Sequence, residues 1–310
     1  MKPEFEFIKE IRRRFPAPEG VRGIGDDCAV LPQQDGMETL VSTDMLVEGT
    51  HFLRSDITPF QLGWKAAASN FSDIAAMGGS PAGCFLALAL PKDLPCGWEE
   101  EFLRGLGEIS AIYGFPLLGG DTTSSPDRIS VCMTVLGKAP SGRSLKRSTA
   151  VPGDLICVTG TLGDSAAGLH SILHGTDRVP QLIERHYLPR PRIKEGLALA
   201  SCNGVHAMMD ISDGIGSDLR HILEESGTGA EVELSKIPMS EELLEFCARL
   251  SLDPYDFSVS GGEDYELLFT VDPGAETSLG VAHTVIGRVV PGSGIVWRGS
   301  DRDFQGYTHF

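Results

Sequence analysis

The chain has 310 residues, of which 41% are hydrophobic and 22% are charged, and its formal net charge is −17 at pH 7. This composition excludes a disordered or low-complexity protein, and the length favours two domains of roughly 150 residues each. The excess of Asp and Glu over Lys and Arg, 43 against 26, would repel a phosphate backbone or an acidic membrane, so we expect neither nucleic acid nor membrane as a partner.

The N-terminal stretch MKPEFEFIKEIRRRF has charges spread through it and lacks the continuous apolar core of a signal peptide. The longest apolar run, CFLALAL at 84–90, is too short to span a bilayer and predicts a buried strand. The seven cysteines include no CxxC pair, which argues against a disulfide framework and a zinc ribbon. We therefore expect a cytoplasmic protein whose cysteines are mostly small core residues.

Helical and extended patterns alternate along the chain. Apolar residues at helical spacing predict helices at 4–15, 59–78, 98–113, 163–174, 192–202, 215–226 and 240–251. Strand candidates are 27–31, 38–46, 83–90, 129–137, 154–159, 205–211, 230–234, 264–271 and 284–290. Thr58 followed by Pro59 is a strong helix start. The order of elements predicts an α/β or α+β fold, with fewer regular crossovers than a barrel needs.

The segment KAPSGRSLKRSTAVPGD at 138–154 connects the two halves of this pattern. It is rich in Gly, Pro, Ser and basic residues and has almost no large apolar ones, as is typical of a linker. We therefore expect an N-terminal domain at 1–138 and a C-terminal α/β domain at 139–310.

Aspartates recur where acids are unusual, at the ends of apolar strands and on a helix face of small residues. They are Asp26 and Asp27 in GIGDDCAV, Asp44 in VSTDML, Asp73 in SNFSDIAAMGG, Asp121 in LLGGDTT, and Asp210 and Asp213 in MMDISDG. Carboxylates without His or Cys companions suit Mg²⁺ or Ca²⁺ better than Zn²⁺, and the spacing does not fit an EF-hand. Any one of them could instead be a turn or cap residue, but the recurrence favours a Mg²⁺ site.

The alternation of a strand decides which of these side chains can share a site. Ser42 and Asp44 point the same way, whereas Thr43 points to the opposite face and could reach the same site only through its carbonyl. Asp26 and Asp27 cannot both face one site in an extended chain, so they need not share a proton.

Glycines stand beside several of the acids. Gly119 and Gly120 precede Asp121, Gly214 follows Asp213, and Gly262 precedes Glu263, so a ligand could approach the backbone closely. A metal ion held by carboxylates, together with nearby backbone N–H groups and a basic segment, is an arrangement that binds the phosphates of a nucleotide. Neither GxxxxGK[ST] nor GxGxxG nor GxSxG occurs, which argues against a P-loop enzyme, a Rossmann dehydrogenase and a serine hydrolase with that nucleophile motif.

Eight motifs and a closing GYTHF together resemble one bacterial family. They are GIGDDCAVL, STDMLVEGTHF, NFSDIAAMGGSPAG, LLGGDTT, GRSLKRS, VTGTLGDSAAGL, MDISDG and SGGEDYELLF. In order and approximate spacing, over nearly the whole chain, they are similar to the thiamine-monophosphate kinases. The wider superfamily includes aminoimidazole ribonucleotide synthetase, selenophosphate synthetase and a hydrogenase-maturation dehydratase.

The resemblance implies a two-domain fold like that of aminoimidazole ribonucleotide synthetase, in which the N-terminal domain builds a shared β-barrel in a homodimer. ATP would bind where the domains meet. The implied reaction is ATP plus thiamine monophosphate giving ADP plus thiamine diphosphate, by direct in-line transfer assisted by several Mg²⁺ ions.

The resemblance also assigns site residues. By position, Asp27, Ser42, Thr43, Asp44, Asp73, Asp121, Asp210 and Asp213 are similar to Mg²⁺ ligands, and Asp27, Asp44, Asp73, Asp121 and Asp210 would carry the catalysis. Gly120, Asp121, Arg147 and Ser212 would contact the nucleotide, and His51, Glu263 and Tyr307 the thiamine side. The family usually has Arg-Ser-Gly where this chain has RST at 147–149, which leaves open whether Arg143, Lys146 or Arg147 meets the phosphates.

The chemistry explains why so many acids are tolerable. Both reactants bring phosphate anions, and the attacking phosphate oxygen is already ionised, so charge repulsion and alignment form the barrier. Mg²⁺ ions between carboxylates and phosphates would lower it, and we expect those cations to compensate the pair in GDDCAV.

The thiamine-side residues each have a plain structural alternative. A lone histidine such as His51 is more often a satisfied structural residue than a ligand. Glu263 could accept from the aminopyrimidine amine or offset the thiazolium charge, or be a turn acid in water. Tyr307 could stack on a flat heterocycle or simply pack the tail.

Two other readings fit the same motifs. A sister enzyme of the superfamily would use the same Mg–ATP site with another acceptor. Selenophosphate synthetase needs a reactive cysteine in the segment before GIGDDC, and this chain has none there. The hydrogenase-maturation enzyme needs a C-terminal cysteine, whereas the last cysteine here is Cys247. A non-catalytic nucleotide-binding module of the same fold would bind ATP without turnover.

Overall fold

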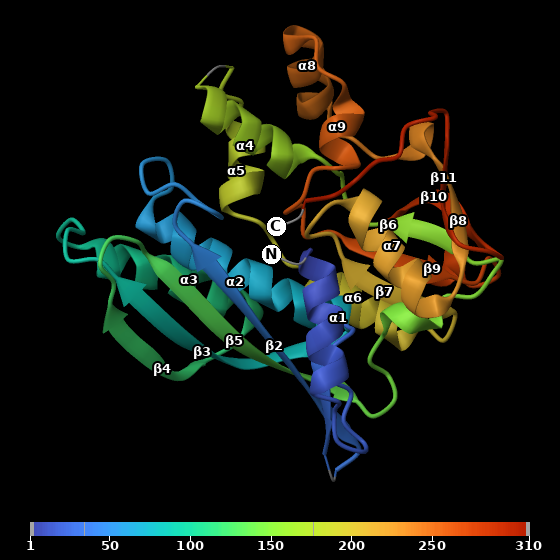
Figure 1. Cartoon of the computed structure of the whole chain (residues 1–310), viewed down its shortest axis with the longest axis horizontal. Helices are drawn as coiled ribbons and strands as arrows, with labels where there is room; N and C mark the ends of the chain where they lie inside the picture. The colour runs from blue at the N-terminus through green and yellow to red at the C-terminus, as the bar shows by residue number, and fades with distance from the viewer. Residues whose placement is uncertain (1–2, 34, 176, 308–310) are drawn as a thin grey trace.

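The computed structural model describes residues 3–33, 35–175 and 177–307. Two mixed sheets dominate it (Figure 1). The first has five strands in the order β1-β2-β5-β3-β4 and comes from residues 29–140, whereas the second has six in the order β11-β8-β10-β6-β9-β7 and comes from residues 155–298. The arrangement is the α/β (α+β) class that the sequence predicts.

The N-terminal half contributes three helices and the first sheet within the described residues. Its elements are α1 (Glu4–Arg14), β1 (Ala29–Pro32), β2 (Met37–Val47), α2 (Pro59–Ala76), β3 (Ser80–Leu90), α3 (Trp98–Tyr113), β4 (Leu117–Ser124) and β5 (Ser130–Pro140). A short 3-10 helix, η1 (Arg147–Thr149), follows in the connecting segment.

The C-terminal half contributes the second sheet and helices on its faces and edges. Its elements are β6 (Leu155–Val158), α4 (Asp164–His174), α5 (Pro180–Tyr187), α6 (Ile193–Ser201), β7 (Val205–Asp210), α7 (Ile215–Ser226), β8 (Gly229–Glu233), η2 (Leu234–Lys236), α8 (Glu241–Leu250), α9 (Pro254–Ser258), β9 (Leu267–Val271), η3 (Glu276–Ser278), β10 (Thr284–Val290) and β11 (Gly294–Arg298). Each predicted helix and strand is confirmed to within a few residues, whereas α5, α9, β4 and β11 were not predicted.

Helix α2 lies at the centre of the molecule. It starts at a capping box formed by Thr58 and Gln61, with Pro59 in the first turn, as the sequence predicts. Fourteen of its 18 residues are buried because it contacts β2 and β5 on one side and α6 and β7 on the other. Gly63 lets it approach α3, since a Cβ there would lie 2.1 Å from a backbone carbonyl oxygen. This position brings polar residues of α2 between the two halves.

One apolar core runs from the first sheet through α2 into the second half. It joins residues such as Leu40 and Phe71 to Leu199 and Phe269. A second core lies between the second sheet and α7, with Ile222 and Val232 as members. The shared first core fixes how the two halves sit around the space between them.

The first sheet has helices on one face and an open second face (Figure 1). Every residue of β4 is exposed, and the open face includes Met45, which is 53% exposed, and Phe85, which is 41% exposed. The described chain therefore leaves an apolar sheet face and an unpaired edge strand uncovered. None of the helices within the described ranges combines the length and apolar character needed to cross a bilayer.

Candidate functional site

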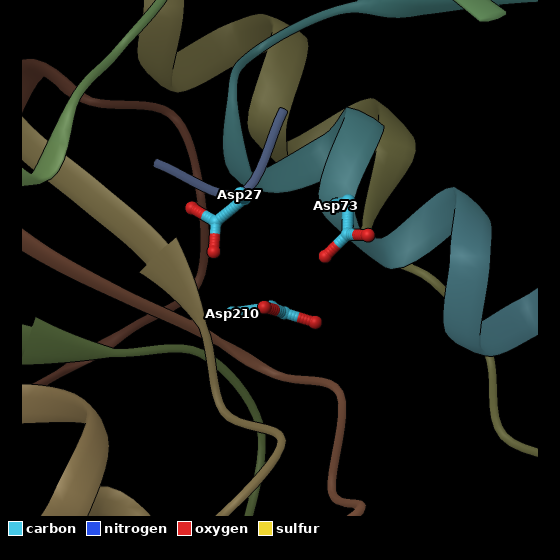
Figure 2. A group of neighbouring side chains, drawn as sticks. All are labelled: Asp27, Asp73 and Asp210. Carbon is cyan, nitrogen blue, oxygen red and sulfur yellow. The ribbon is translucent and has the colours of Figure 1, made fainter. Parts of the chain in front are cut away.

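Three carboxylates from distant parts of the sequence converge between the two sheets. Asp27 precedes β1, Asp73 lies on α2 and Asp210 ends β7, and each offers an oxygen within 4.8 Å of the others (Figure 2). Asp27 and Asp210 are buried and Asp73 is half-buried. We call these three residues the acidic cluster.

The acidic cluster is short of positive charge. Burial and the neighbouring carboxylates raise the pKa of Asp73 well above its ordinary value, and burial together with the charge of Asp27 raises the pKa of Asp210 to about 7. The guanidinium of Arg147 pairs with one oxygen of Asp27, while the other, Oδ2, is buried and has no hydrogen-bond partner among the described residues. An orphaned carboxylate oxygen in a set of hard oxygen donors fits a divalent cation such as Mg²⁺.

Strand β2 places its predicted ligands as the alternation requires. The hydroxyl of Ser42 donates to Asp73, and the backbone N–H of Asp44 donates to the side-chain oxygen of Asn70 at 3.0 Å. Thr43 points to the other face, where its hydroxyl donates to the carbonyl of Met133 at 3.0 Å. Ser42 and Asp44 therefore lie beside the acidic cluster, whereas Thr43 presents only its backbone to that side.

Asp26 and Asp27 are each compensated by an arginine. Asp26 pairs with Arg22 and also accepts from the backbone N–H of Arg147 at 2.8 Å, whereas Asp27 pairs with the side chain of Arg147. The sequence analysis assigned this compensation to metal ions alone and missed both arginines, although Arg22 is only four residues from Asp26; Arg147 is 120 residues from Asp27, beyond the reach of local spacing.

Gly120 and Asp121 lie away from the acidic cluster in this chain. Across the sheet, Asp44 is in register with Met133, Leu86 and Gly120, so three strand spacings, roughly 14 Å, separate Asp44 from Gly120. Asp121 alternates to the open face of the sheet and is exposed. The fold of one chain does not bring these two residues to the other predicted ligands.

The three basic candidates of the connecting segment have different surroundings. Arg143 donates to the side chain of Asn203, and Lys146 forms an isolated backbone bridge with Ala207. Arg147 alone contacts a member of the acidic cluster, and its Nε is buried without a partner among the described residues. Of the three, Arg147 is therefore the residue that lies at the acidic cluster.

A buried acid that the sequence analysis did not single out shapes the next loop. Asp218 on α7 accepts from the backbone N–H groups of Ser212, Asp213 and Gly214 at 3.1, 3.2 and 3.1 Å. It is 1% exposed, and burial raises its pKa. The sequence offered one signal for this role, because Asp218 is an acid on the apolar face of a predicted helix, one residue before Leu219. Asp218 holds the loop that carries two predicted site residues.

A cavity of about 650 Å³ lies beside these groups. Asp44 and His51 line it from the first half, and Ser212, Glu263 and Tyr307 line it from the second. The three predicted thiamine-side residues thus share one cavity with predicted metal and nucleotide residues, including Asp213.

Backbone contacts hold two of the predicted thiamine-side residues, His51 and Tyr307. His51 accepts from the backbone N–H of Val47 at its Nδ1, 3.0 Å away, which places the ring proton on Nε2. The backbone N–H of Tyr307 donates to the carbonyl of Asp213 at 2.9 Å, so the tail is tied to the loop held by Asp218. Thr308, His309 and Phe310, which complete the GYTHF motif, lie outside the described residues.

Glu263 has a partner that the sequence analysis did not predict. The ammonium of Lys65 on α2 lies 2.9 Å from its Oε2, and His186 on α5 also contacts this pair. A lysine in the otherwise small and apolar run LGWKAAAS was the only local signal.

Two domain families match consecutive parts of the chain. Residues 25–139 match the AIR synthase related protein, N-terminal domain, and residues 151–298 match the AIR synthase related protein, C-terminal domain.

Named relatives cover almost the whole chain. Thiamine-monophosphate kinase of Salmonella typhimurium is 44% identical over an alignment of 307 positions, and the match covers 93% of this chain and 91% of that protein. A solved structure described as AaThiL complexed with AMPPCP and TMP is 35% identical, with a TM-score of 0.91 and coverage of 99% of this chain and 97% of that one. The crystal structure of thiamine monophosphate kinase from Aquifex aeolicus is 33% identical, with a TM-score of 0.85 and coverage of 95% and 97%.

Proposed function

Because the chain belongs to the thiamine-monophosphate kinase family, we propose that it phosphorylates thiamine monophosphate with ATP, giving thiamine diphosphate and ADP. The AMPPCP and TMP of the AaThiL complex support an ATP-dependent reaction on this acceptor. The observation that carries the proposal is the single cavity in which His51, Glu263 and Tyr307 meet Asp44 and the loop at 212–213. One molecule of acceptor and the phosphates of ATP could meet there.

We propose Mg²⁺ as the resident metal, in more than one copy. Asp27, Asp73 and Asp210 would hold it, with Asp44, Ser42 and the backbone of Thr43 beside them and Asp213 toward the cavity. The orphaned oxygen of Asp27 and the high pKa of Asp73 support this assignment, because both indicate carboxylates built to meet external cations. When bound, Mg²⁺ would neutralise phosphate charge during transfer.

The chain's own residues would then do the aligning. We propose that Arg147 and Ser212 contact the nucleotide, while His51, Glu263 and Tyr307 orient the acceptor so that its phosphate oxygen attacks in line. That oxygen is already an anion, so a general base is unnecessary and no phosphoenzyme forms. Asp218 supports the same step indirectly, since it holds Ser212 in place.

We also propose a homodimer built through the N-terminal unit, which we take as residues 1–138, with 139–310 as the C-terminal unit. The open apolar face and the unpaired edge of β4 support it, because a second copy would cover both. Gly120 and Asp121 lie on that strand, so they would reach the nucleotide site of the second copy rather than their own. The seven cysteines are all free, and we place the protein in the reducing cytoplasm.

Product analysis tests the function. Purified protein is mixed with ATP, excess Mg²⁺ and either thiamine monophosphate or thiamine. We expect thiamine diphosphate and ADP in equal amounts, dependent on Mg²⁺, with no reaction on thiamine and no labelled phosphoryl group retained on the protein. ATP binding without turnover of either acceptor would instead identify a sister activity or a non-catalytic module.

A further inference from the structure

Lys65 is a fully buried lysine whose role neither the metal site nor the nucleotide site explains. Its side chain is 0% exposed, and it lies on α2 among alanines. Its ammonium contacts Oε2 of Glu263 at 2.9 Å and Nε2 of His186 at 3.3 Å. Lysines are almost never fully buried unless they are paired, and this one is paired with a residue of the cavity wall.

The donors and acceptors fix the state of this network. An ammonium can only donate, so Nε2 of His186 accepts and its proton sits on Nδ1. That Nδ1 lies 3.0 Å from the hydroxyl of Ser165 and 3.3 Å from Oε2 of Glu263. Burial and the charge of Lys65 lower the pKa of His186 to about 3, so the imidazole is neutral. The network therefore contains one cation, Lys65, and one anion, Glu263.

Lys65 and His186 contact the same oxygen of Glu263. Nζ of Lys65 lies 2.9 Å from Oε2, and Nδ1 of His186 lies 3.3 Å from it. The backbone at Glu263 has a φ of +62°, and its N–H donates to the carbonyl of Ser212 at 2.8 Å. A turn in this conformation, held by the loop and by two side chains, allows the carboxylate little freedom.

We propose that Lys65 is a positioning residue that determines recognition of the thiamine end of the acceptor. It holds Glu263 ionised and anchored through Oε2, so that the other oxygen faces the cationic, amine-bearing heterocycle. This inference rests on the proposed function, because Glu263 is assigned to the acceptor there.

The titratable groups around Glu263 determine how its pKa would respond to the loss of Lys65. They are Lys65 on α2, His186 on α5, His51 before α2, and Tyr265 in the same turn. Burial alone would raise the pKa of Glu263, but Lys65, His186 and His51 together hold it below its ordinary value. Without Lys65 the largest of the lowering effects is gone, so the pKa of Glu263 would rise and its carboxylate would take up a proton at a higher pH than in the wild type.

Steady-state kinetics of Lys65→Met, Glu263→Gln and the double variant test the inference. Lys65→Met should raise the KM for thiamine monophosphate by about tenfold at pH 7, more at pH 6 and less at pH 9, relative to the wild type, with kcat and the KM for ATP within about twofold. Glu263→Gln should raise the same KM to a similar extent at all three pH values. The exposed Lys194 on α6 supplies the control, and Lys194→Met should change nothing.

The double variant separates positioning from a general structural effect. If Lys65 acts through Glu263, Lys65→Met should add less than about twofold to the KM in the Glu263→Gln background. This comparison also holds if Lys65→Met alone does not fold, because the double variant buries no unpaired charge. The inference would be overturned, and the proposed function left standing, if Lys65→Met had the same KM for thiamine monophosphate as the wild type. A further large increase of this KM in the double variant over Glu263→Gln would have the same meaning. A wild type that leaves thiamine monophosphate unchanged would overturn the proposed function and the inference with it.

Discussion

The acidic cluster and the Glu263 network bury carboxylates in opposite ways within one site. In the acidic cluster, only Asp27 forms an ion pair with an arginine among the described residues, and its second oxygen is buried without a partner there. In the Glu263 network, one carboxylate meets one buried lysine and a neutral histidine. In the proposed function, the first region depends on cations that the chain does not supply, whereas the charges of the second are paired within the chain.

This difference matches the two kinds of ligand. Phosphates bound to Mg²⁺ arrive with positive charge. The carboxylates of a site for them can therefore repel one another while the site is empty, because the metal ions compensate that repulsion on binding. A flat organic cation needs a fixed hydrogen-bond acceptor in one orientation, which requires support from behind. The comparison therefore predicts opposite responses when a carboxylate is neutralised in each region.

The largest effect should come from Asp73→Asn. Loss of one carboxylate from the acidic cluster removes metal charge with little change in volume, so turnover should fall by about a thousandfold or more, and Asp44→Asn should behave alike. The pKa of Asp73 is raised in the folded state, so its ionised form opposes folding and Asn relieves that repulsion. Metal-free Asp73→Asn should therefore unfold at a higher temperature than the wild type, as circular dichroism can measure. Unchanged kinetics in both variants would contradict the metal assignment.

Lys65→Met should lower the free energy of unfolding by about 1–3 kcal/mol, because it leaves the half-buried carboxylate of Glu263 without its cation. Denaturant unfolding at pH 8 measures this loss. The double variant with Glu263→Gln should recover most of it, since both charges are then gone. If Lys65→Met were as stable as the wild type, Lys65 would not be compensating the cost of burying the Glu263 carboxylate.

A smaller effect is expected from Asp218→Asn, which replaces one carboxylate oxygen that accepts three backbone N–H groups. The amide oxygen is a weaker acceptor, and about 1–3 kcal/mol of loop order should be lost. Calorimetric titration should show weaker ATP binding. Tight ATP binding in this variant would mean that the 212–214 loop does not need Asp218.

Local sequence patterns predicted most of the fold, for identifiable reasons. Helices α2 and α7 have clear apolar periodicity and were placed within two residues. Strand β4 was missed because LLGGDTTS combines two glycines with an acid and has no alternation, which is typical of a turn. The strand predicted at 264–271 starts only at Leu267, because Glu263 and Tyr265 adopt positive φ in the preceding turn.

Local spacing could not predict the partnerships of the site. The Lys65–Glu263 contact joins residues 198 positions apart, and the arginine that meets Asp27 comes from 120 positions away. The motifs pointed to acidic residues one by one, and their resemblance to a family grouped them. Which ones meet in one chain, as Asp27 and Asp73 do and Asp121 does not, depends on how the two sheets close around α2.

The most direct test of the contrast is the effect of Mg²⁺ on thermal unfolding of the wild type, Asp73→Asn and Glu263→Gln. A cation that binds only the folded state stabilises it by about 2.7 kcal/mol at a hundred times its dissociation constant. We predict that Mg²⁺ raises the melting temperature of the wild type and of Glu263→Gln by the same amount and leaves that of Asp73→Asn almost unchanged. Equal shifts in all three proteins, or no shift in the wild type, would contradict the account of the acidic cluster as a site that external cations complete.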